Sequence, residues 1–330
     1  MFGLFRPSCF AILFYPLVLT VTVLAQTSID DVHVGMRTQG ITLATPETAR
    51  GVHLIRSSVD LVTVPVTITD AFNRPVVGLD QGNFQVFENK KPQEIRNFST
   101  DDAPVSIGII LDTSGSMANK LERARDAVRA FCEVSNPQDE FFMITFSDAP
   151  HLASDFTNRP EELENGLLTV QSRGRTALLD AIYMGLHKMR QARYPRRALL
   201  VLSDGGDNHS RYSERDVKNA AREADVLMYA VGIFDTYFNT EEEMLGPGLL
   251  RSMTNLTGGQ AFTLSSFADL PSMTRLIGNQ LRYQYMLAYR PPTDTKDGKW
   301  HKISVRLRLP KSIHALLHVN ARPGYYAAQQ

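Results

Sequence analysis

One short stretch of the sequence, in which an apolar strand ends at an acid and a cluster of hydroxyls, most constrains the fold. Residues 105–111 are mostly apolar and predict a buried strand. Asp112, Ser114 and Ser116 follow at alternate positions, and the amphipathic run 119–134 predicts a helix directly afterwards. A strand, a tight polar turn and a helix form the unit with which open α/β sheets build ligand sites at the carboxyl ends of their strands.

The turn supplies only hard oxygen donors, namely one carboxylate and two serine hydroxyls. Such a set suits Mg²⁺, Mn²⁺ or Ca²⁺ far better than zinc or copper. The simplest alternative is that Asp112 and Ser114 only cap the following helix, as these residue types commonly do. That alternative accounts for the turn alone, but it does not account for matching donors elsewhere in the chain.

Three segments in order resemble the motifs of the von Willebrand factor type A domain. Residues 112–116 resemble its Asp-x-Ser-x-Ser motif, which opens a metal-ion-dependent adhesion site in that family. Residues 174–178 resemble its Gly-x-Thr-x-Leu segment, and residues 200–205 resemble its apolar strand ending in Thr/Ser-Asp-Gly. The resemblance implies five ligands of one divalent cation, most simply Mg²⁺: Asp112, Ser114, Ser116, Thr176 and Asp204.

Such a site would hold its ion with two carboxylates and neutral hydroxyls, which leaves the cation electrophilic and without a full protein ligand shell. The ion would then take water or an oxygen from outside. The resemblance implies that a partner protein supplies this oxygen from an Asp or Glu carboxylate. We therefore predict a non-enzymatic, metal-dependent protein-binding or adhesion module. The resemblance also implies that the segment 267–281 slides when the site is occupied.

A hydrolase is the alternative class. An aspartic protease needs two Asp-Thr-Gly turns that share a proton, and the sequence holds no intact pair. A serine hydrolase needs a Gly-x-Ser-x-Gly elbow, which is absent. A phosphatase-like enzyme that uses the same open cation site stays possible, although no general base stands out beside it. Turnover that vanishes in Asp112→Ala would decide for this alternative.

Strands and helices alternate between residues 105 and 281, and the strands there are apolar throughout. This pattern predicts an α/β fold with a doubly wound, mostly parallel, Rossmann-like sheet covered on both faces. Ser213 and Ser266 are predicted to cap helices. A helix is also expected over 249–256.

The two flanks have β character instead. β-branched and apolar residues alternate over 59–69, with Pro65 indicating an edge or a bulge, and further strands are predicted after residue 281, the last over 314–319. Neither flank alone can bury a sandwich core. We therefore predict a β-sandwich-like module built from residues 59–100 and 282–330, with the von Willebrand factor type A domain, 103–281, inserted between them.

The first flank also resembles the N-terminal part of a bacterial family of von Willebrand factor A-related proteins. The matching segments are 66–70, 77–79 and 84–88. The turn glycines usual in that family are replaced here by Asn73 and by Asn89-Lys90. Because Asn tolerates left-handed backbone, we expect these turns to persist.

Residues 1–25 predict a secretory signal peptide. Arg6 supplies a positive charge, residues 9–24 are nearly all apolar, and a small-residue cleavage site places the cut between Ala25 and Gln26. An uncleaved anchor is the alternative, because the apolar run approaches the spanning length of about 20 residues. We predict removal of the signal, no membrane insertion afterwards, and a secreted or periplasmic, cell-envelope location.

The remaining composition sets few further limits. Lys+Arg and Asp+Glu both number 35 in 330 residues, so no net charge directs the protein to nucleic acid, and none is predicted as a partner. Removal of the signal would leave Cys132 as the only cysteine, which excludes an intramolecular disulfide. Residues 26–58 are polar without a period and predict a flexible lead-in. No feature indicates an oligomeric state.

Overall fold

The computed structural model describes most of the chain after the lead-in, and residues 57–330 belong to one compact unit. The described ranges are 61–168, 170–204, 206–233, 241–292, 297–314 and 316–327. The predicted signal segment and the predicted lead-in lie outside the described residues.

A six-stranded sheet in the order β10-β9-β8-β5-β6-β7 forms the centre of the α/β part. Its strands are β5 (Val105–Asp112), β6 (Glu140–Phe146), β7 (Pro150–Thr157), β8 (Arg196–Ser203), β9 (Leu227–Ile233) and β10 (Ala261–Leu264). All neighbouring strands are parallel except β6 and β7, which are antiparallel. The mostly parallel sheet expected from the sequence is therefore confirmed.

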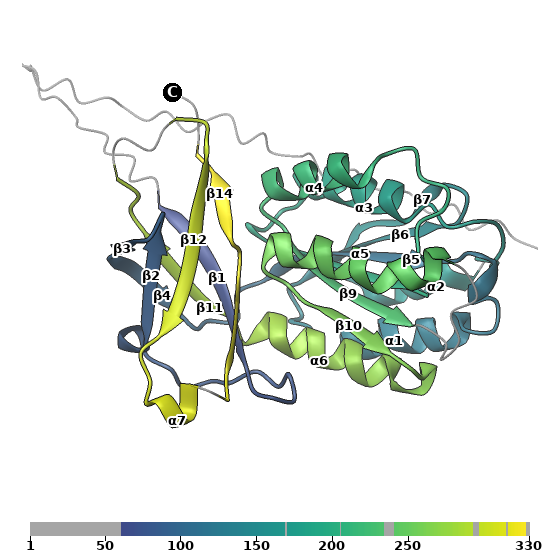
Figure 1. Cartoon of the computed structure of the whole chain (residues 1–330). Helices are drawn as coiled ribbons and strands as arrows, with labels where there is room; N and C mark the ends of the chain where they lie inside the picture. The colour runs from purple at the N-terminus through teal and green to yellow at the C-terminus, as the bar shows by residue number, and fades with distance from the viewer. Residues whose placement is uncertain are drawn as a thin grey trace, which may run out of the picture. The chain divides into compact units, whose positions relative to one another are not determined.

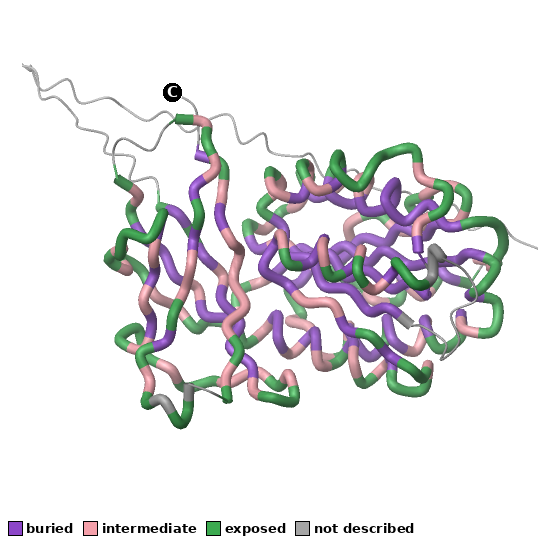
Figure 2. Tube along the Cα trace, viewed as in Figure 1, coloured by how far each residue is buried: buried purple, intermediate pink, exposed green. Residues whose placement is uncertain are grey.

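Helices cover both faces of this sheet (Figure 1). One face carries α1 (Leu121–Glu133), α2 (Pro160–Leu168) and α6 (Leu270–Arg282), and the other carries α3 (Leu178–Lys188), α4 (Glu214–Glu223) and α5 (Glu241–Thr257). Side chains of β5 alternate between the two layers, because Ile109 and Leu111 join the first cluster and Ile110 joins the second. Figure 2 shows the central strands almost wholly buried, whereas the outer helix faces are exposed.

Both predicted helix caps are present. Ser213 accepts a hydrogen bond from the backbone N–H of Asp216 at the start of α4. Ser266 accepts one from Ala268 at the short helix η4 (Phe267–Asp269), which leads into α6. Helix α5 begins at Glu241, eight residues before the predicted start, and contains Pro247. The added part of the helix holds Gly246, Pro247 and Gly248, residue types that disfavour helix interiors.

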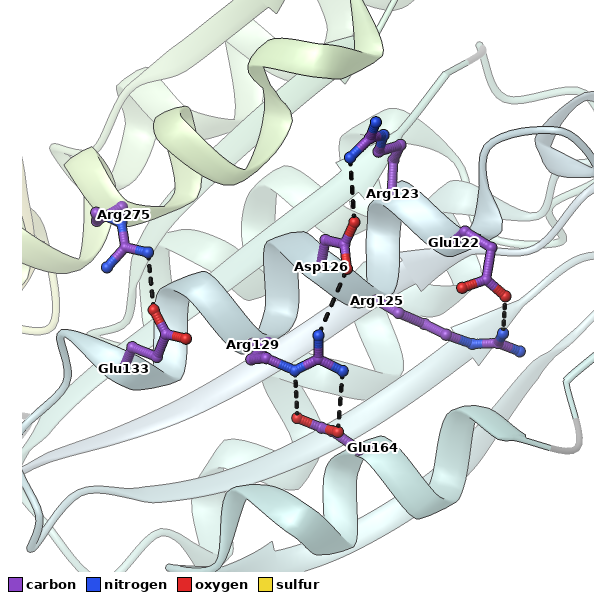
Figure 3. Close-up of polar contacts among 8 residues, drawn as sticks. All are labelled: Glu122, Arg123, Arg125, Asp126, Arg129, Glu133, Glu164 and Arg275. Carbon is purple, nitrogen blue, oxygen red and sulfur yellow. Dashed lines mark hydrogen bonds and ion pairs between the residues drawn. The ribbon is translucent and has the colours of Figure 1, made fainter.

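The outward face of α1 carries ion pairs that reach its neighbouring helices (Figure 3). Arg129 contacts Glu164 of α2 at 3.0 Å, and Arg275 of α6 contacts Glu133 at 2.7 Å. All four side chains are more than a third exposed, so each pair adds little stability. On the same helix Cys132 is partly buried against the core, and burial raises the pKa of its thiol to about 12.

The flanks form two four-stranded antiparallel sheets, in the orders β13-β1-β11-β4 and β14-β12-β2-β3. Each sheet combines strands from before and after the α/β part, as expected for a sandwich built from both flanks. The strands are β1 (Val62–Thr69), β2 (Phe84–Glu88), β3 (Lys91–Gln93), β4 (Ile95–Ser99), β11 (Tyr285–Tyr289), β12 (Trp300–Leu307), β13 (His318–Ala321) and β14 (Gly324–Tyr326). Phe84 and Tyr285 meet inside this module, with ring centroids 4.9 Å apart.

Pro65 lies in a strand that is central in the sheet order but has only one neighbour at that point. β1 pairs with β11 over Val62–Val66, and it pairs with β13 only from Val66 onward. The proline therefore removes no ladder hydrogen bond on the β13 side, which agrees with the expected edge position.

The asparagine turns also form as expected, since Asn73, Asn89 and Lys90 all have positive φ. The strand predicted over 314–319 is present, but its predicted bounds are wrong. His314 ends a short helix, α7 (Lys311–His314), and β13 spans His318–Ala321. Two further short helices, η1 (Gln81–Asn83) and η3 (Met189–Gln191), complete the described elements together with η2 (Gly115–Met117).

Candidate metal centre

The predicted ligands lie where the order of the central sheet reverses. The chain passes from β5 through α1 to β6 on one side, and from β8 through α4 to β9 on the other. β5 and β8 are adjacent and parallel, so their carboxyl ends meet at this switch point, where α/β sheets bind ligands. Asp112 is the last residue of β5, and Asp204 directly follows β8.

Hydrogen bonds join four of the five predicted residues into one cluster. The Ser116 hydroxyl donates to Asp204 Oδ1 at 2.8 Å and lies 3.1 Å from the Ser114 hydroxyl. The backbone N–H of Ser114 donates to Asp112 Oδ1 at 2.8 Å. Asp112 Oδ2 accepts a further bond from the Ser203 hydroxyl at 2.6 Å. The two carboxylates predicted from separate motifs therefore belong to one hydrogen-bonded cluster with three serines.

Thr176, the fifth predicted residue, is buried in the loop next to this cluster. The backbone N–H of Gly115 donates to the Gly174 carbonyl at 3.1 Å, which ties the two loops together. Asn208 accepts from the Thr176 N–H at 2.9 Å and returns its own N–H to the Thr176 carbonyl at 3.0 Å. Among the described residues no hydrogen bond links the Thr176 hydroxyl to the other four, so the structure places its loop beside the cluster through backbone contacts alone.

Gly174 gives this loop its shape. Its φ is +83°, a backbone conformation that favours glycine. A Cβ at this position would lie 2.5 Å from Asp148 Oδ2. Oδ1 of the same carboxylate accepts a hydrogen bond from the backbone N–H of Arg175 at 2.9 Å. This bond anchors the loop to Asp148. Both backbone and space therefore require a glycine two residues before Thr176.

The electrostatics of the cluster favour a cation. Asp112 is fully buried, and this burial together with the nearby Asp204 carboxylate raises the pKa of Asp112 to about 6. The hydrogen bonds from Ser203 and Ser114 act in the opposite direction. A divalent ion between the two carboxylates would remove their repulsion, and the hydroxyls are neutral donors of the kind that Mg²⁺ accepts. The residues present thus fit the predicted metal.

Lys120 is a part of the site that the sequence did not point to. Its ammonium lies 2.5 Å from Asp204 Oδ2, and 4.5 Å from the centre of the Phe267 ring. The side chain is only 13% exposed. The sequence does place a lysine between the Asp112–Ser116 turn and α1, but it does not show that the side chain of Lys120 points toward Asp204. Ser203 and Asn208 were missed for the same reason.

Two further acids serve the loops rather than the cluster. Asp180 accepts from the backbone N–H groups of Arg211 and Tyr212 at 2.8 and 3.0 Å. Asp207 accepts from the backbone of Leu179 at 3.1 Å. Within the part of the chain that the structure describes, no three His, Cys, Asp or Glu side chains are grouped to hold a metal. A cation here therefore depends on the hydroxyl oxygens.

The fold is an open, Rossmann-like α/β sheet with a cluster of carboxylate and hydroxyl oxygens at its switch point. The family profile described as von Willebrand factor type A domain matches residues 107–206, which include all five candidate ligands. Residues 107–206 therefore match the von Willebrand factor type A domain, and the α/β part of the fold agrees with this match.

Similar proteins are distant. An uncharacterized protein of Borreliella burgdorferi is 23% identical over 187 residues, which are 49% of this chain and 54% of that protein. The chain thus spans about half the length of this relative. A UPF0353 protein of Mycolicibacterium paratuberculosis is 26% identical over 242 residues, or 66% of this chain and 71% of the relative. The solved von Willebrand factor type A structure from Catenulispora acidiphila is 11% identical, covers 83% of this chain and 75% of its own, and has a TM-score of 0.47.

Proposed function

We propose that the protein is a non-enzymatic, divalent-cation-dependent protein-binding module. The observation that carries this proposal is the linkage of two buried carboxylates by two serines: the Ser114 backbone N–H donates to Asp112, and the Ser116 hydroxyl, next to that of Ser114, donates to Asp204. The negative charges of Asp112 and Asp204 repel each other in this cluster, and a bound dication removes that repulsion. Mg²⁺ is the expected ion, with Mn²⁺ or Ca²⁺ as substitutes, because every donor is an oxygen.

The binding step follows from what the cluster lacks. Two carboxylates and three hydroxyls give the ion fewer charged ligands than a closed site would, so a position stays available for an outside oxygen. Ser116 is exposed while Asp112 and Asp204 are buried, so the open side faces solvent at Ser116. A partner protein would complete the ion with an Asp or Glu carboxylate, which makes one strong contact at the centre of the interface.

We further propose that the protein acts outside the cytoplasm, after removal of the segment before Gln26. This part of the proposal rests on the sequence pattern, since that segment lies outside the described residues. In the described part of the chain, no helix combines the length and the apolar character needed to cross a membrane.

Cation binding is tested by titrating MnCl₂ into protein dialysed against EDTA and measuring the heat. We expect saturable binding of one ion, which Asp204→Asn abolishes or weakens strongly. Asp180→Asn is the matched control, because Asp180 is also a buried carboxylate but binds backbone N–H groups outside the predicted ligand set. Absence of heat in the unmodified protein would refute the proposal.

Partner binding is tested by capturing proteins from the native cell envelope in Mg²⁺ or in EDTA. We expect capture that requires Mg²⁺, is lost in Asp204→Asn and is reduced by acetate, which competes as a carboxylate. The phosphatase alternative is tested in parallel with p-nitrophenyl phosphate. Turnover that depends on Mg²⁺ and vanishes in Asp112→Ala would replace the binding function with an enzymatic one.

A further inference from the structure

The ion pair between Lys120 and Asp204 places a cation of the chain itself against a predicted metal ligand. The ammonium lies 2.5 Å from Asp204 Oδ2, while the other oxygen of the same carboxylate accepts from Ser116. Both oxygens of Asp204 are therefore already engaged by groups of the protein. A dication that binds Asp204 has to share or replace these contacts.

The pair is shielded from water, which makes this competition matter. The side chain of Asp204 is 1% exposed and that of Lys120 is 13% exposed. Charges in such surroundings are screened far less than charges at the surface. The ammonium is also tethered, since Lys120 directly precedes α1, so dilution does not remove it.

The ring of Phe267 provides a second favourable contact for the ammonium of Lys120. Its ring centre lies 4.5 Å from Lys120 Nζ, within the range of a cation–π contact. The ring belongs to η4, which leads into α6, and is not among the predicted ligands. Lys120 can therefore leave Asp204 without losing every favourable contact of its charge.

We propose that Lys120 is a built-in competitor of the divalent cation, which sets the affinity of the site by holding Asp204 until the ion displaces it. This inference rests on the proposed function, because it concerns the same cation site. It makes two demands. Removing the lysine charge should strengthen cation binding, and it should also leave the cation-free protein less stable, because Asp112 and Asp204 then repel each other without a counter-charge.

The chain offers a closely matched control in Lys188. Its side chain is also 13% exposed, its ammonium lies 2.6 Å from Asp155, and it lies 5.4 Å from the centre of the Phe156 ring. Lys188 thus shares the exposure of Lys120 and also contacts a carboxylate and an aromatic ring, but it contacts no predicted metal ligand. Its carboxylate partner is 66% exposed, and its ammonium also donates to Gln191 at 2.7 Å. Lys188→Met therefore makes the same change in net charge as Lys120→Met, away from the predicted ligands.

The experiment titrates MnCl₂ into the EDTA-dialysed protein and into Lys120→Met, Lys120→Gln, Lys120→Arg and Lys188→Met. We expect both neutral variants at position 120 to bind Mn²⁺ about tenfold tighter, a factor equal to ~1.4 kcal/mol and intermediate between exposed and buried ion pairs. Lys120→Arg and Lys188→Met should keep the original dissociation constant. Thermal melting of the same variants should show a lower cation-free midpoint for Lys120→Met and a larger rise with Mn²⁺.

The outcomes separate the two claims. If the unmodified protein binds Mn²⁺ but the neutral variants bind equally or more weakly, the competitor role is wrong and the proposed function stands. Equal tightening by Lys188→Met would also overturn it, since a general charge effect would then explain the result. If the unmodified protein does not bind Mn²⁺, the proposed function fails and the inference fails with it.

Discussion

Replacing Gly174 by alanine tests how the loop that carries Thr176 is built. Gly174 has a φ of +83°, and alanine in a left-handed conformation costs ~1–2 kcal/mol. The new Cβ would also lie 2.5 Å from Asp148 Oδ2 and force that carboxylate to move. Moving it breaks the bond from the Arg175 N–H, which adds about 0.5–1.5 kcal/mol.

Gly78→Ala separates the two costs. Gly78 has a φ of +84° and is exposed like Gly174, but a Cβ there meets no atom within 4 Å. Urea unfolding followed by circular dichroism should show a loss from backbone strain alone in Gly78→Ala. The loss in Gly174→Ala should be larger by the cost of moving Asp148.

Mn²⁺ affinity gives a second measurement on the same pair of variants. Gly174→Ala should weaken binding, because the displaced loop carries Thr176 away from the cluster, and Gly78→Ala should leave the dissociation constant unchanged. Equal losses of stability together with equal affinities would show that the loop is not held as the structure indicates, and the assignment of Thr176 would then lose its support.

Two further predictions concern other parts of the chain. Burial lowers the pKa of His301, but hydrogen bonds to Asp297 and Glu88 outweigh it and raise the pKa above 6.5. The stability from this charge is complete below pH 6.5 and is lost as the pH rises through the raised pKa. In His301→Gln the free energy of unfolding, measured against pH, should not show this decrease. Gly108→Ala should lower the free energy of unfolding by about 1–3 kcal/mol, because its Cβ would lie 2.3 Å from Phe142 Cζ. An unchanged midpoint of urea unfolding would contradict this packing.

The central fold could be predicted from the sequence because its strands are apolar throughout and alternate with amphipathic helices. Apolar strands between amphipathic helices leave few arrangements other than a covered parallel sheet. Once β5 and β8 are neighbours, their register places Leu111 beside Leu202, so the acids that follow must approach each other. The positions of the motifs at the ends of these strands therefore predicted that Asp112 and Asp204 lie close together.

What the sequence missed depends on contacts between distant residues. The pair of Lys120 with Asp204 joins residues 84 positions apart, and Asn208 holds Thr176 across 32 positions. No local period records such contacts. The C-terminal error has the same origin, because the segment 314–319 has an extended pattern, but α7 takes up its first residue and β13 pairs with β1 only from His318. Tertiary pairing decided the boundary there.

The central claim is that side chains from three separate segments hold one dication. Crystals grown in millimolar MnCl₂ and measured at the manganese absorption edge test it most directly. We predict one anomalous peak, with oxygens of Asp112, Ser114, Ser116 and Asp204 within bonding distance and Thr176 reaching it directly or through one water. A peak elsewhere, or none between the carboxyl ends of β5 and β8, would contradict the account.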